Sequence, residues 1–252
     1  MSKTIYYISG GSSGLGFQLV RQISAEPSNL VIASARNLER SPKLVDISNA
    51  RPNVKPITVD VSDEASVQTI KTQIKKIGVD HIDVFISNAA IADSFYTIDK
   101  TPKEVFLSHY ITNTLGPILV YQQLYDYILK GNTKKIIFVS SVAGSMGNFF
   151  PVSNCAYGQS KAALNYTSKV LSAELANEEV VVVAVHPGVV STPGGVIASK
   201  KLLELQPELK STIETLTISE EESVRLLLEI IKNLKLEDTG KFLNNDGTEI
   251  PW

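Results

Sequence analysis

A glycine-rich loop directly after the first apolar run constrains the fold of this chain most. The run Thr4–Ser9 leads into the loop Gly10–Gly16, and a segment with helical spacing of apolar residues follows. Glycines at such a strand-to-helix turn allow a tight bend, let the backbone approach a pyrophosphate and place a helix N-terminus beside its charge. The loop therefore predicts a dinucleotide site, and a plain glycine turn is the alternative.

Short β-branched runs alternate with longer segments of helical spacing along the chain, a pattern typical of βαβ units and a parallel sheet. No internal repeat, low-complexity tract or linker divides the sequence, so we predict one α/β domain over residues 1–252. Residues 192–215 begin with a Pro-Gly-Gly run and are expected to form a substrate lid, with a plain surface connection as the alternative. The expected strands are Thr4–Ser9, Leu30–Ala35, Val54–Val59, Ile82–Ser87, Lys135–Ser140, Val180–Val185 and Lys241–Leu243.

Two serines are expected to cap helices. Ser62 precedes an apolar stripe that includes Val67 and Ile70, and Ser219 opens a Ser-x-x-Glu capping box before Val224. Both segments are therefore predicted to be helices rather than loops.

Charge and cysteine content exclude several classes of function. The 24 Lys+Arg against 26 Asp+Glu give a formal net charge of −2, so nucleic acid is a poor candidate partner. Cys155 has no partner in the chain and the three histidines are far apart, which excludes a disulfide or a zinc site and favours a reducing, cytoplasmic compartment. The same spacing of cysteine and histidines means that no metal site is expected. The longest aliphatic run, Val180–Val185, is far below bilayer length, so no membrane segment is expected either.

Arg36 directly follows the second expected strand, at the place where NAD-binding folds often carry an acid for the ribose hydroxyls. A guanidinium can instead pair with a 2′-phosphate, helped by Arg40 and the hydroxyls of Ser12 and Ser13. NADP(H) is therefore favoured over NAD(H), and a solvated surface arginine is the alternative.

Two further strand ends carry residues expected at the cofactor. Asp60 and Val61 end the third strand, where they would meet the adenine, although Asp60 could equally be a turn acid. The run His186–Thr192 follows the sixth strand, and its backbone could clamp a nicotinamide carboxamide. His186 itself is interpreted as a packed strand-end residue rather than a catalyst.

Tyr157 and Lys161 are spaced i,i+4, which places the phenol and the ammonium on one face of a helix. A phenol has a pKa near 10, and an adjacent cation lowers it, so the pair is a plausible proton donor. The same spacing recurs at Tyr96 and Lys100, but only Tyr157 follows the C-terminal end of a strand, where parallel sheets bind ligands. We therefore select Tyr157 and interpret the second pair as a coincidence.

Ser141 ends the fifth strand, where its hydroxyl can reach a substrate carbonyl beside Tyr157. A nucleophilic serine is the rival hypothesis, but neither a Gly-x-Ser-x-Gly motif nor a suitably placed histidine supports it. Asn113 lies in a helix that continues through Pro117, whose missing N–H leaves the Asn113 carbonyl free. That carbonyl could hold a water that links Lys161 to solvent, and a kink serving packing alone is the alternative.

Together these motifs resemble those of the short-chain dehydrogenases/reductases over essentially the whole chain. The resemblance implies a doubly wound (Rossmann) parallel sheet of seven strands and a catalytic tetrad of Asn113, Ser141, Tyr157 and Lys161. It also implies that Tyr157 protonates the substrate oxygen while the reduced nicotinamide delivers hydride. The residues that carry it are Ser9–Gly16, Asp60, Asn88, Ala89, Ala90, Asn113, Ser141, Tyr157, Lys161, Pro187 and Gly188.

The same resemblance assigns supporting roles around the cofactor. Ser141 would orient the carbonyl, Lys161 would hold the nicotinamide ribose, and Asn113 would support a water relay. The Val190 backbone and Thr192 would meet the carboxamide. The expected cofactor-binding residues are Gly10, Ser12, Ser13, Gly14, Leu15, Gly16, Arg36, Asp60, Val61, Asn88, Ala89, Ala90, Tyr157, Lys161, Pro187, Gly188, Val190 and Thr192.

Within the family the chain is similar to the sniffer and C-factor type of carbonyl reductase and to fungal diketone reductases. Ser9 replaces a threonine, Ala90 replaces the glycine of the Asn-Ala-Gly motif, and the Ser141–Tyr157 separation exceeds the commonest spacing. The segment Ser145–Asn154 is therefore expected to loop out over the substrate, although its aromatic residues could instead serve the core or a subunit contact. The expected substrate residues are Val142, Met146, Phe149, Phe150 and Val189.

The sequence thus predicts an NADPH-dependent carbonyl reductase for a hydrophobic ketone, diketone or aldehyde. The alternatives are a reductase of a specific pteridine- or steroid-like metabolite and a dinucleotide-binding sensor with little turnover. A methyltransferase would leave Lys161 and the rest of the tetrad unexplained. By resemblance, the helices that carry Asn113 and Tyr157 pair between subunits, so a homodimer or homotetramer is expected.

Overall fold

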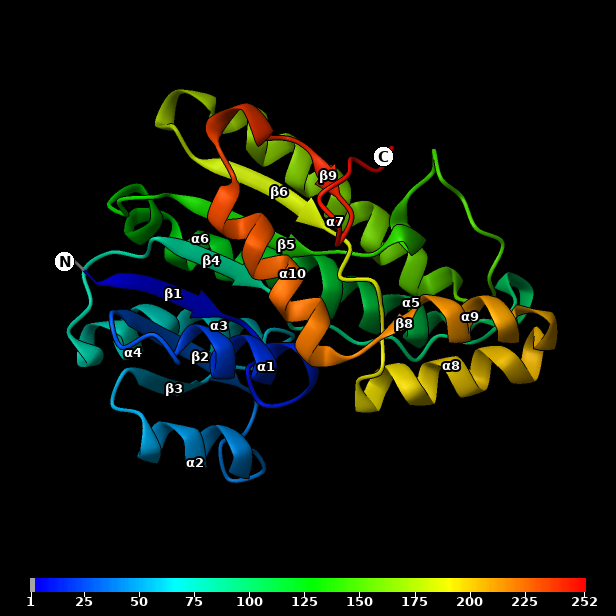
Figure 1. Ribbon diagram of the computed structural model, residues 1–252, viewed down its shortest axis with the longest axis horizontal. Helices are drawn as coiled ribbons and strands as arrows, with labels where there is room; N and C mark the ends of the chain where they lie inside the picture. The colour runs from blue at the N-terminus through cyan, green and yellow to red at the C-terminus, as the bar shows by residue number, and fades with distance from the viewer. Residues whose placement is uncertain (1–2) are drawn as a thin grey trace.

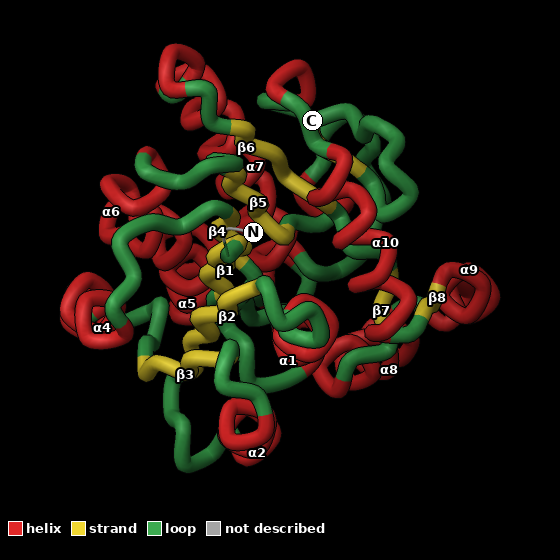
Figure 2. The backbone as a smooth tube through the Cα atoms, turned by 60° about the vertical axis from the view of Figure 1, so that its left-hand side comes forward, coloured by secondary structure: helices red, strands yellow, loops and turns green. Residues whose placement is uncertain are grey.

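The computed structural model describes residues 3–252 and shows a parallel sheet with helices on both faces (Figures 1 and 2). The sheet has seven strands in the order β3-β2-β1-β4-β5-β6-β9, and every neighbouring pair is parallel. This confirms the predicted doubly wound, seven-stranded fold. The strands are β1 Thr4–Ile8, β2 Asn29–Ala35, β3 Val54–Thr58, β4 Val84–Ser87, β5 Lys135–Val139, β6 Val181–Val185 and β9 Phe242–Leu243.

Alternate residues of the strands enter two separate cores, which explains why the strands read as continuous apolar runs. In β5, Ile136 and Phe138 pack toward the helices α3, α4, α6 and α7. Ile137 and Val139 pack toward α1, α2 and α10 on the opposite face. The helices are α1 Gly14–Ile23, α2 Pro42–Ala50, α3 Glu64–Gln68, α4 Ile70–Ile77, α5 Lys103–Tyr110, α6 Gly116–Leu129, α7 Cys155–Glu174, α8 Pro193–Leu205, α9 Lys210–Leu216 and α10 Glu220–Asn233.

The helix α10 is capped as expected, whereas the predicted cap of α3 shifts by one residue. The Ser219 hydroxyl accepts a hydrogen bond from the Glu222 N–H. At α3, Asp63 rather than Ser62 accepts from the Ala65 N–H, and the Ser62 hydroxyl donates to Asp60 instead. Asp and Ser are nearly equal as caps, so the sequence alone does not choose between neighbours.

A second, two-stranded sheet pairs β7, Val189–Val190, with β8, Thr217–Ile218, beyond the edge of the main body. Between these strands, α8 and α9 project beside the body (Figure 1). No side chain of α8 or α9, both of which the structure describes in full, is buried.

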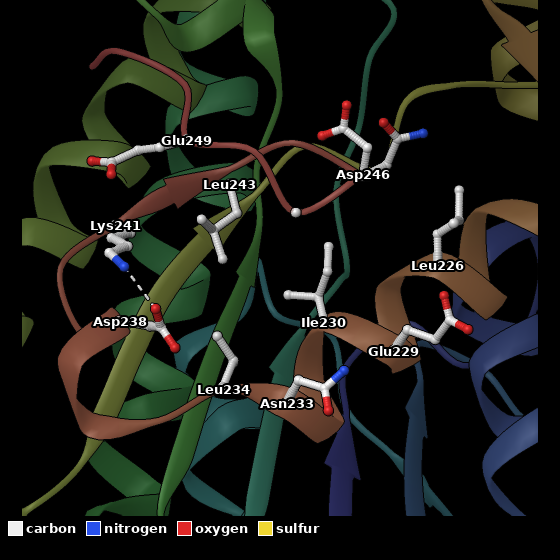
Figure 3. A pocket seen from close by; sticks show the side chains of 12 residues that line it. Leu226, Glu229, Ile230, Asn233, Leu234, Asp238, Lys241, Leu243, Asp246 and Glu249 are labelled. Carbon is white, nitrogen blue, oxygen red and sulfur yellow. Dashed lines mark hydrogen bonds and ion pairs between the residues drawn. The ribbon is translucent and has the colours of Figure 1, made fainter.

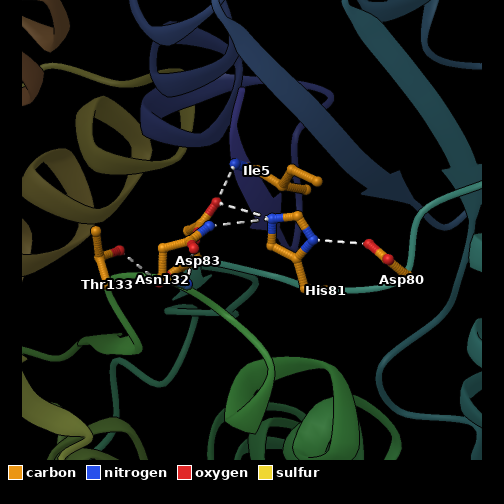
Figure 4. A network of polar contacts seen from close by, with 6 residues as sticks. All are labelled: Ile5, Asp80, His81, Asp83, Asn132 and Thr133. Carbon is orange, nitrogen blue, oxygen red and sulfur yellow. Dashed lines mark hydrogen bonds and ion pairs between the residues drawn. The ribbon is translucent and has the colours of Figure 1, made fainter. Parts of the chain in front are cut away.

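Asp83 connects the N-terminal ends of the central strands, at the end of the sheet opposite the glycine loop (Figure 4). Its side chain is 1% exposed and accepts hydrogen bonds of 2.7 Å from the N–H groups of Ile5 and Asn132. The Asn132 side-chain amide donates a third bond, and the His81 ring lies 3.5 Å away. One carboxylate thus fixes the starts of β1 and β4 and the turn before β5.

Asp83→Ala should lower the free energy of unfolding by about 3 kcal/mol, because the buried Ile5 N–H, the part-buried Asn132 N–H and the Asn132 side-chain amide lose their acceptor. Urea denaturation measures the loss, and Asp80→Ala is the matched control because that neighbouring side chain is 91% exposed. A loss below about 1 kcal/mol in the Asp83 variant would show that the network contributes little.

Candidate active site

A cleft of about 430 Å³ lies where the strands β1, β2, β4 and β5 end. This is the place where open α/β sheets bind ligands, beside the point at which the strand order reverses. All eighteen residues that the sequence assigns to the cofactor line this cleft. The structure adds lining residues that no motif indicated, namely Ala35, Val59, Ser62, Ile91, Ala92, Thr112, Val139, Ser140, Pro193, Gly194, Gly195 and Ala198.

The glycine loop packs so tightly that two of its glycines are required. Gly10 has a φ of +72°, and a Cβ on Gly16 would collide with the Gly10 carbonyl. Asn88 fastens the loop from β4: its side-chain amide donates to the carbonyls of Ser9 and Gly10, at 3.0 and 3.2 Å. In return the Ser9 hydroxyl accepts hydrogen bonds from the N–H groups of Asn88 and Ala89. Serine thus keeps the hydroxyl acceptor of the threonine that it replaces.

The first turn of α1 faces the cleft without a side-chain cap. Ser13 is the N-cap residue, is extended, and makes no cap hydrogen bond with its hydroxyl. The N–H groups at the start of the helix therefore remain available to an anion.

Ala90 causes no backbone strain at the position where the family pattern has glycine. Among the described residues, the non-glycine residues with positive φ are Lys134 and Glu179, so Ala90 has an ordinary conformation. The added methyl group therefore fits beside the cleft that Ala90 lines.

Arg36 extends from the end of β2 into the cleft and is exposed. Arg40, the second expected guanidinium, does not line the cleft. Asp60 lines it and also makes a turn, since its carboxylate accepts from the N–H and hydroxyl of Ser62, at 2.9 and 2.6 Å. The turn interpretation of Asp60 is thus confirmed, and its contact with an adenine stays a prediction.

The run after β6 lines the cleft with Pro187, Gly188, Val190 and Thr192. Thr192 caps α8 by accepting a hydrogen bond of 2.8 Å from the Gly195 N–H. His186 is half-buried with its ring Nδ1 shielded from solvent, and burial of the ring lowers its pKa to about 4, in line with a packed, neutral residue.

Tyr157 and Lys161 both occupy the first turns of α7 and face the end of β5. The Lys161 amine is buried, donates to the Val139 carbonyl at 2.8 Å and lies 5.8 Å from the centre of the Tyr157 ring. Burial lowers the pKa of Lys161 to about 7. Burial also raises the pKa of Tyr157, and the contact with the Ser141 hydroxyl opposes this only in part.

The phenol therefore differs from the expectation drawn from the sequence. A lysine cation was expected to lower the pKa of Tyr157, but burial raises it, the contact that opposes the rise is with Ser141 rather than Lys161, and burial lowers the pKa of Lys161 itself. Tyr157 thus keeps its proton at neutral pH, as a proton donor must.

Asn113 lies at a π-turn, Ile111–Leu115, between α5 and α6. The Gly116 N–H donates to the Ile111 carbonyl, and Pro117 follows in the first turn of α6. The missing N–H of a proline accounts for such a local change in helix pitch.

The Asn113 side chain connects three segments and is fully buried. It exchanges two hydrogen bonds of 2.8 Å with the backbone of Ile91 and donates a third to the Ser160 hydroxyl. Ser160 donates in turn to the Tyr157 carbonyl at 2.7 Å. Sequence reasoning did not assign Ser160, although its i+3 spacing from Tyr157 would have indicated this contact.

The five expected substrate residues lie outside the cleft lining. Met146, Phe149 and Phe150 are 75%, 70% and 47% exposed in the loop before α7, which excludes the core interpretation of these side chains. Val142 directly follows Ser141, and Val189 opens β7.

A second hollow, of about 360 Å³, lies between α10 and the C-terminal hairpin (Figure 3). Lys241 and Asp238 form an ion pair of 2.7 Å within it, and no expected site residue lines it. The residues expected at the cofactor therefore lie at the cleft and not in this hollow.

Residues 3–252 contain no group of three or more His, Cys, Asp or Glu side chains placed to hold a metal ion. In the same part of the chain no helix is both long and apolar enough to cross a membrane.

Known proteins are similar to this chain in sequence and in fold. The family model described as short chain dehydrogenase matches residues 4–201. An uncharacterized oxidoreductase of Schizosaccharomyces pombe is 43% identical over 248 residues, 98% of each chain. The structure of an NADPH bound carbonyl reductase from chicken fatty liver matches with a TM-score of 0.86, 26% identity and full coverage of both chains. The carbonyl reductase Sniffer of D. melanogaster matches with the same TM-score and coverage at 25% identity.

Proposed function

The chain belongs to the short-chain dehydrogenase/reductase family, and on that premise we propose that it is an NADPH-dependent carbonyl reductase. Its substrate is a hydrophobic ketone, diketone or aldehyde, which it reduces to an alcohol. The observation that carries the proposal is the placement of Tyr157 beside the buried Lys161 amine, in the same cleft as the glycine loop. The similarity to a carbonyl reductase with bound NADPH supports the same cofactor here.

The residues of the cleft fit a phosphorylated dinucleotide. Gly16 lets the loop fold closely against its own Gly10 carbonyl, and the uncapped start of α1 offers N–H groups to a pyrophosphate. Arg36 provides a guanidinium for a 2′-phosphate, Asp60 meets the adenine, and Lys161 holds the nicotinamide ribose. When bound, NADPH supplies a hydride to the carbonyl carbon.

The chain's own groups handle the proton and the geometry. Tyr157 donates its phenolic proton to the carbonyl oxygen, which the Ser141 hydroxyl orients. Asn113 holds the start of α7 through Ser160 and so fixes the phenol. Its backbone carbonyl holds a water through which Lys161 exchanges protons with solvent.

The proposal also covers a substrate lid, the oligomeric state and the location of the protein. Residues 192–215 act as a substrate lid, because this segment projects from the body and its α8 lines the cleft. The exposed Tyr110, Tyr125 and Tyr166 on α5, α6 and α7 support a homodimer or homotetramer. A cytoplasmic location stays a prediction from the single Cys155.

NADPH oxidation, with NADH as the comparison, tests the function against vicinal diketones, bulky aryl ketones and aldehydes. Turnover with NADPH and a preference within the panel are expected. Tight NADPH binding without reduction of any compound would instead favour the sensor.

Arg36→Asp should move the cofactor preference toward NADH, because it removes the forked partner of the 2′-phosphate and adds a like charge. We expect the ratio of kcat/KM for NADPH to that for NADH to fall about 100-fold. Arg40→Asp makes the same charge change outside the cleft lining and should lower the ratio much less. Equal effects of both variants would mean that general electrostatics, not a specific contact, sets the preference.

A further inference from the structure

The segment between β7 and β8 is held to the body by few contacts. No side chain of α8, of α9 or of the turn Pro207–Leu209 is buried, so apolar packing contributes little to its position. At its base the segment is fixed by the short β7–β8 pair and by a bond from the Ser191 N–H to the Ile218 carbonyl. A segment with so little buried apolar surface depends on individual polar contacts.

Gln206 provides such a contact at the far end of α8. Its side-chain oxygen accepts a 3.0 Å hydrogen bond from the Ser153 N–H, and its amide nitrogen donates a 2.9 Å bond to the Pro151 carbonyl. The carboxamide thus pairs with both backbone groups on one edge of an extended segment, as a neighbouring strand would. Both bonds join the C-terminal end of α8 to the loop before α7, on the same side of the molecule in Figure 1.

The loop that Gln206 contacts is the one that carries Phe149 and Phe150. The start of this loop is held by the last residues of the chain. The Ser145 hydroxyl donates to the Pro251 carbonyl, and the Gly147 N–H donates to the Trp252 carbonyl. The two phenylalanines lie between these anchors and are exposed. Gln206 therefore joins the end of this loop that precedes α7 to the C-terminal end of α8.

The other end of α8 reaches the proposed catalytic cleft. Gly194, Gly195 and Ala198 line the cleft, and further along the helix the Lys201 amine lies 6.0 Å from the centre of the Phe95 ring. A shift of α8 at Gln206 would consequently change the wall of the cleft.

We infer that Gln206 is a positioning residue that determines substrate specificity: it clasps α8 to segment 151–153 and so holds two apolar segments closed over a bulky carbonyl substrate. The inference rests on the proposed function. Small carbonyl compounds make few contacts with these segments, so the clasp affects bulky substrates and leaves the proton donor Tyr157 in place.

Gln206→Glu is the sharpest test, because a carboxylate keeps the acceptor for Ser153 but turns an oxygen without hydrogen toward the Pro151 carbonyl. Gln206→Met has a similar length and removes both bonds without adding charge. Gln122→Glu, on the exposed surface of α6, is the control for charge.

The first readout is limited trypsin digestion, which does not depend on activity, with fragments assigned by mass spectrometry. Lys200, Lys201 and Lys210 lie within the clasped segment, and both Gln206 variants should be cut there roughly ten-fold faster than the wild type and the Gln122 variant. Unchanged cleavage would overturn the clasp, whatever the activity of the protein.

The second readout is the KM of a bulky aryl ketone and of a small aldehyde. Both Gln206 variants should raise the KM for the ketone roughly five-fold and leave kcat for the aldehyde within about two-fold of wild type. Faster cleavage without a change in the ketone KM would overturn the role in specificity. If the wild type reduces no carbonyl compound, the proposed function fails, and the digestion alone still decides whether Gln206 holds the segment.

Discussion

Tyr157→Phe should abolish carbonyl reduction while NADPH binding persists. The variant loses only the hydroxyl, whose pKa is raised by burial and which therefore carries the proton at neutral pH. Without that donor, the charge that develops on the carbonyl oxygen has no proton source, and kcat should fall by about 1000-fold or more. The phenylalanine ring keeps the packing of α7, so the Kd for NADPH should stay within about three-fold of wild type.

The chain contains its own control for this experiment. Tyr96 also stands four residues before a lysine, but it is 42% exposed in the loop after β4. Tyr96→Phe should therefore leave kcat within about two-fold of wild type. Substantial activity in the Tyr157 variant would contradict the mechanism, and equal losses in both variants would remove the distinction between the two motifs.

The architecture could be predicted because it depends on local patterns. The alternation of β-branched runs and helical stripes specifies a parallel sheet, and the glycine loop after β1 places the cofactor end of the sheet. The Ser219 cap and the gathering of eighteen expected residues along one cleft follow from the same arrangement.

Features that depend on distant segments were not predictable in this way. The burial that raises the pKa of Tyr157 needs β5 and the loops around α7 to be in place. The exposure of Phe149 and the Gln206 clasp depend on where α8 lies, and no periodic pattern encodes that position. The irregular helix through Asn113 and Pro117 was predictable, but its form, the π-turn Ile111–Leu115, was not, because a kink and a change in helix pitch both accommodate the proline.

Lys161→Met should abolish turnover and yet stabilise the fold near neutral pH. The folded chain holds the Lys161 proton with a pKa of about 7, whereas the unfolded chain holds it with the ordinary value of 10.5. This lowering of the pKa means that burying the charged amine costs the folded state at most roughly 5 kcal/mol. Loss of the hydrogen bond to the Val139 carbonyl offsets part of this, so a net gain of about 2 kcal/mol is expected below pH 7.

The sign of the pH dependence separates this explanation from a general packing effect. Below about pH 7 both states of the wild type carry the proton, and the cost of burying the charge is fully present. As pH rises from there toward 10.5, only the unfolded state keeps the proton, so the wild type gains stability and the advantage of the methionine variant shrinks. Urea denaturation at pH 6, 8 and 9.5 measures this narrowing, and Lys75→Met on the exposed surface of α4 should show none of it. A constant difference across this range would mean that the buried amine is not the titrating group, and the same amine could then not serve as the proton relay behind Tyr157.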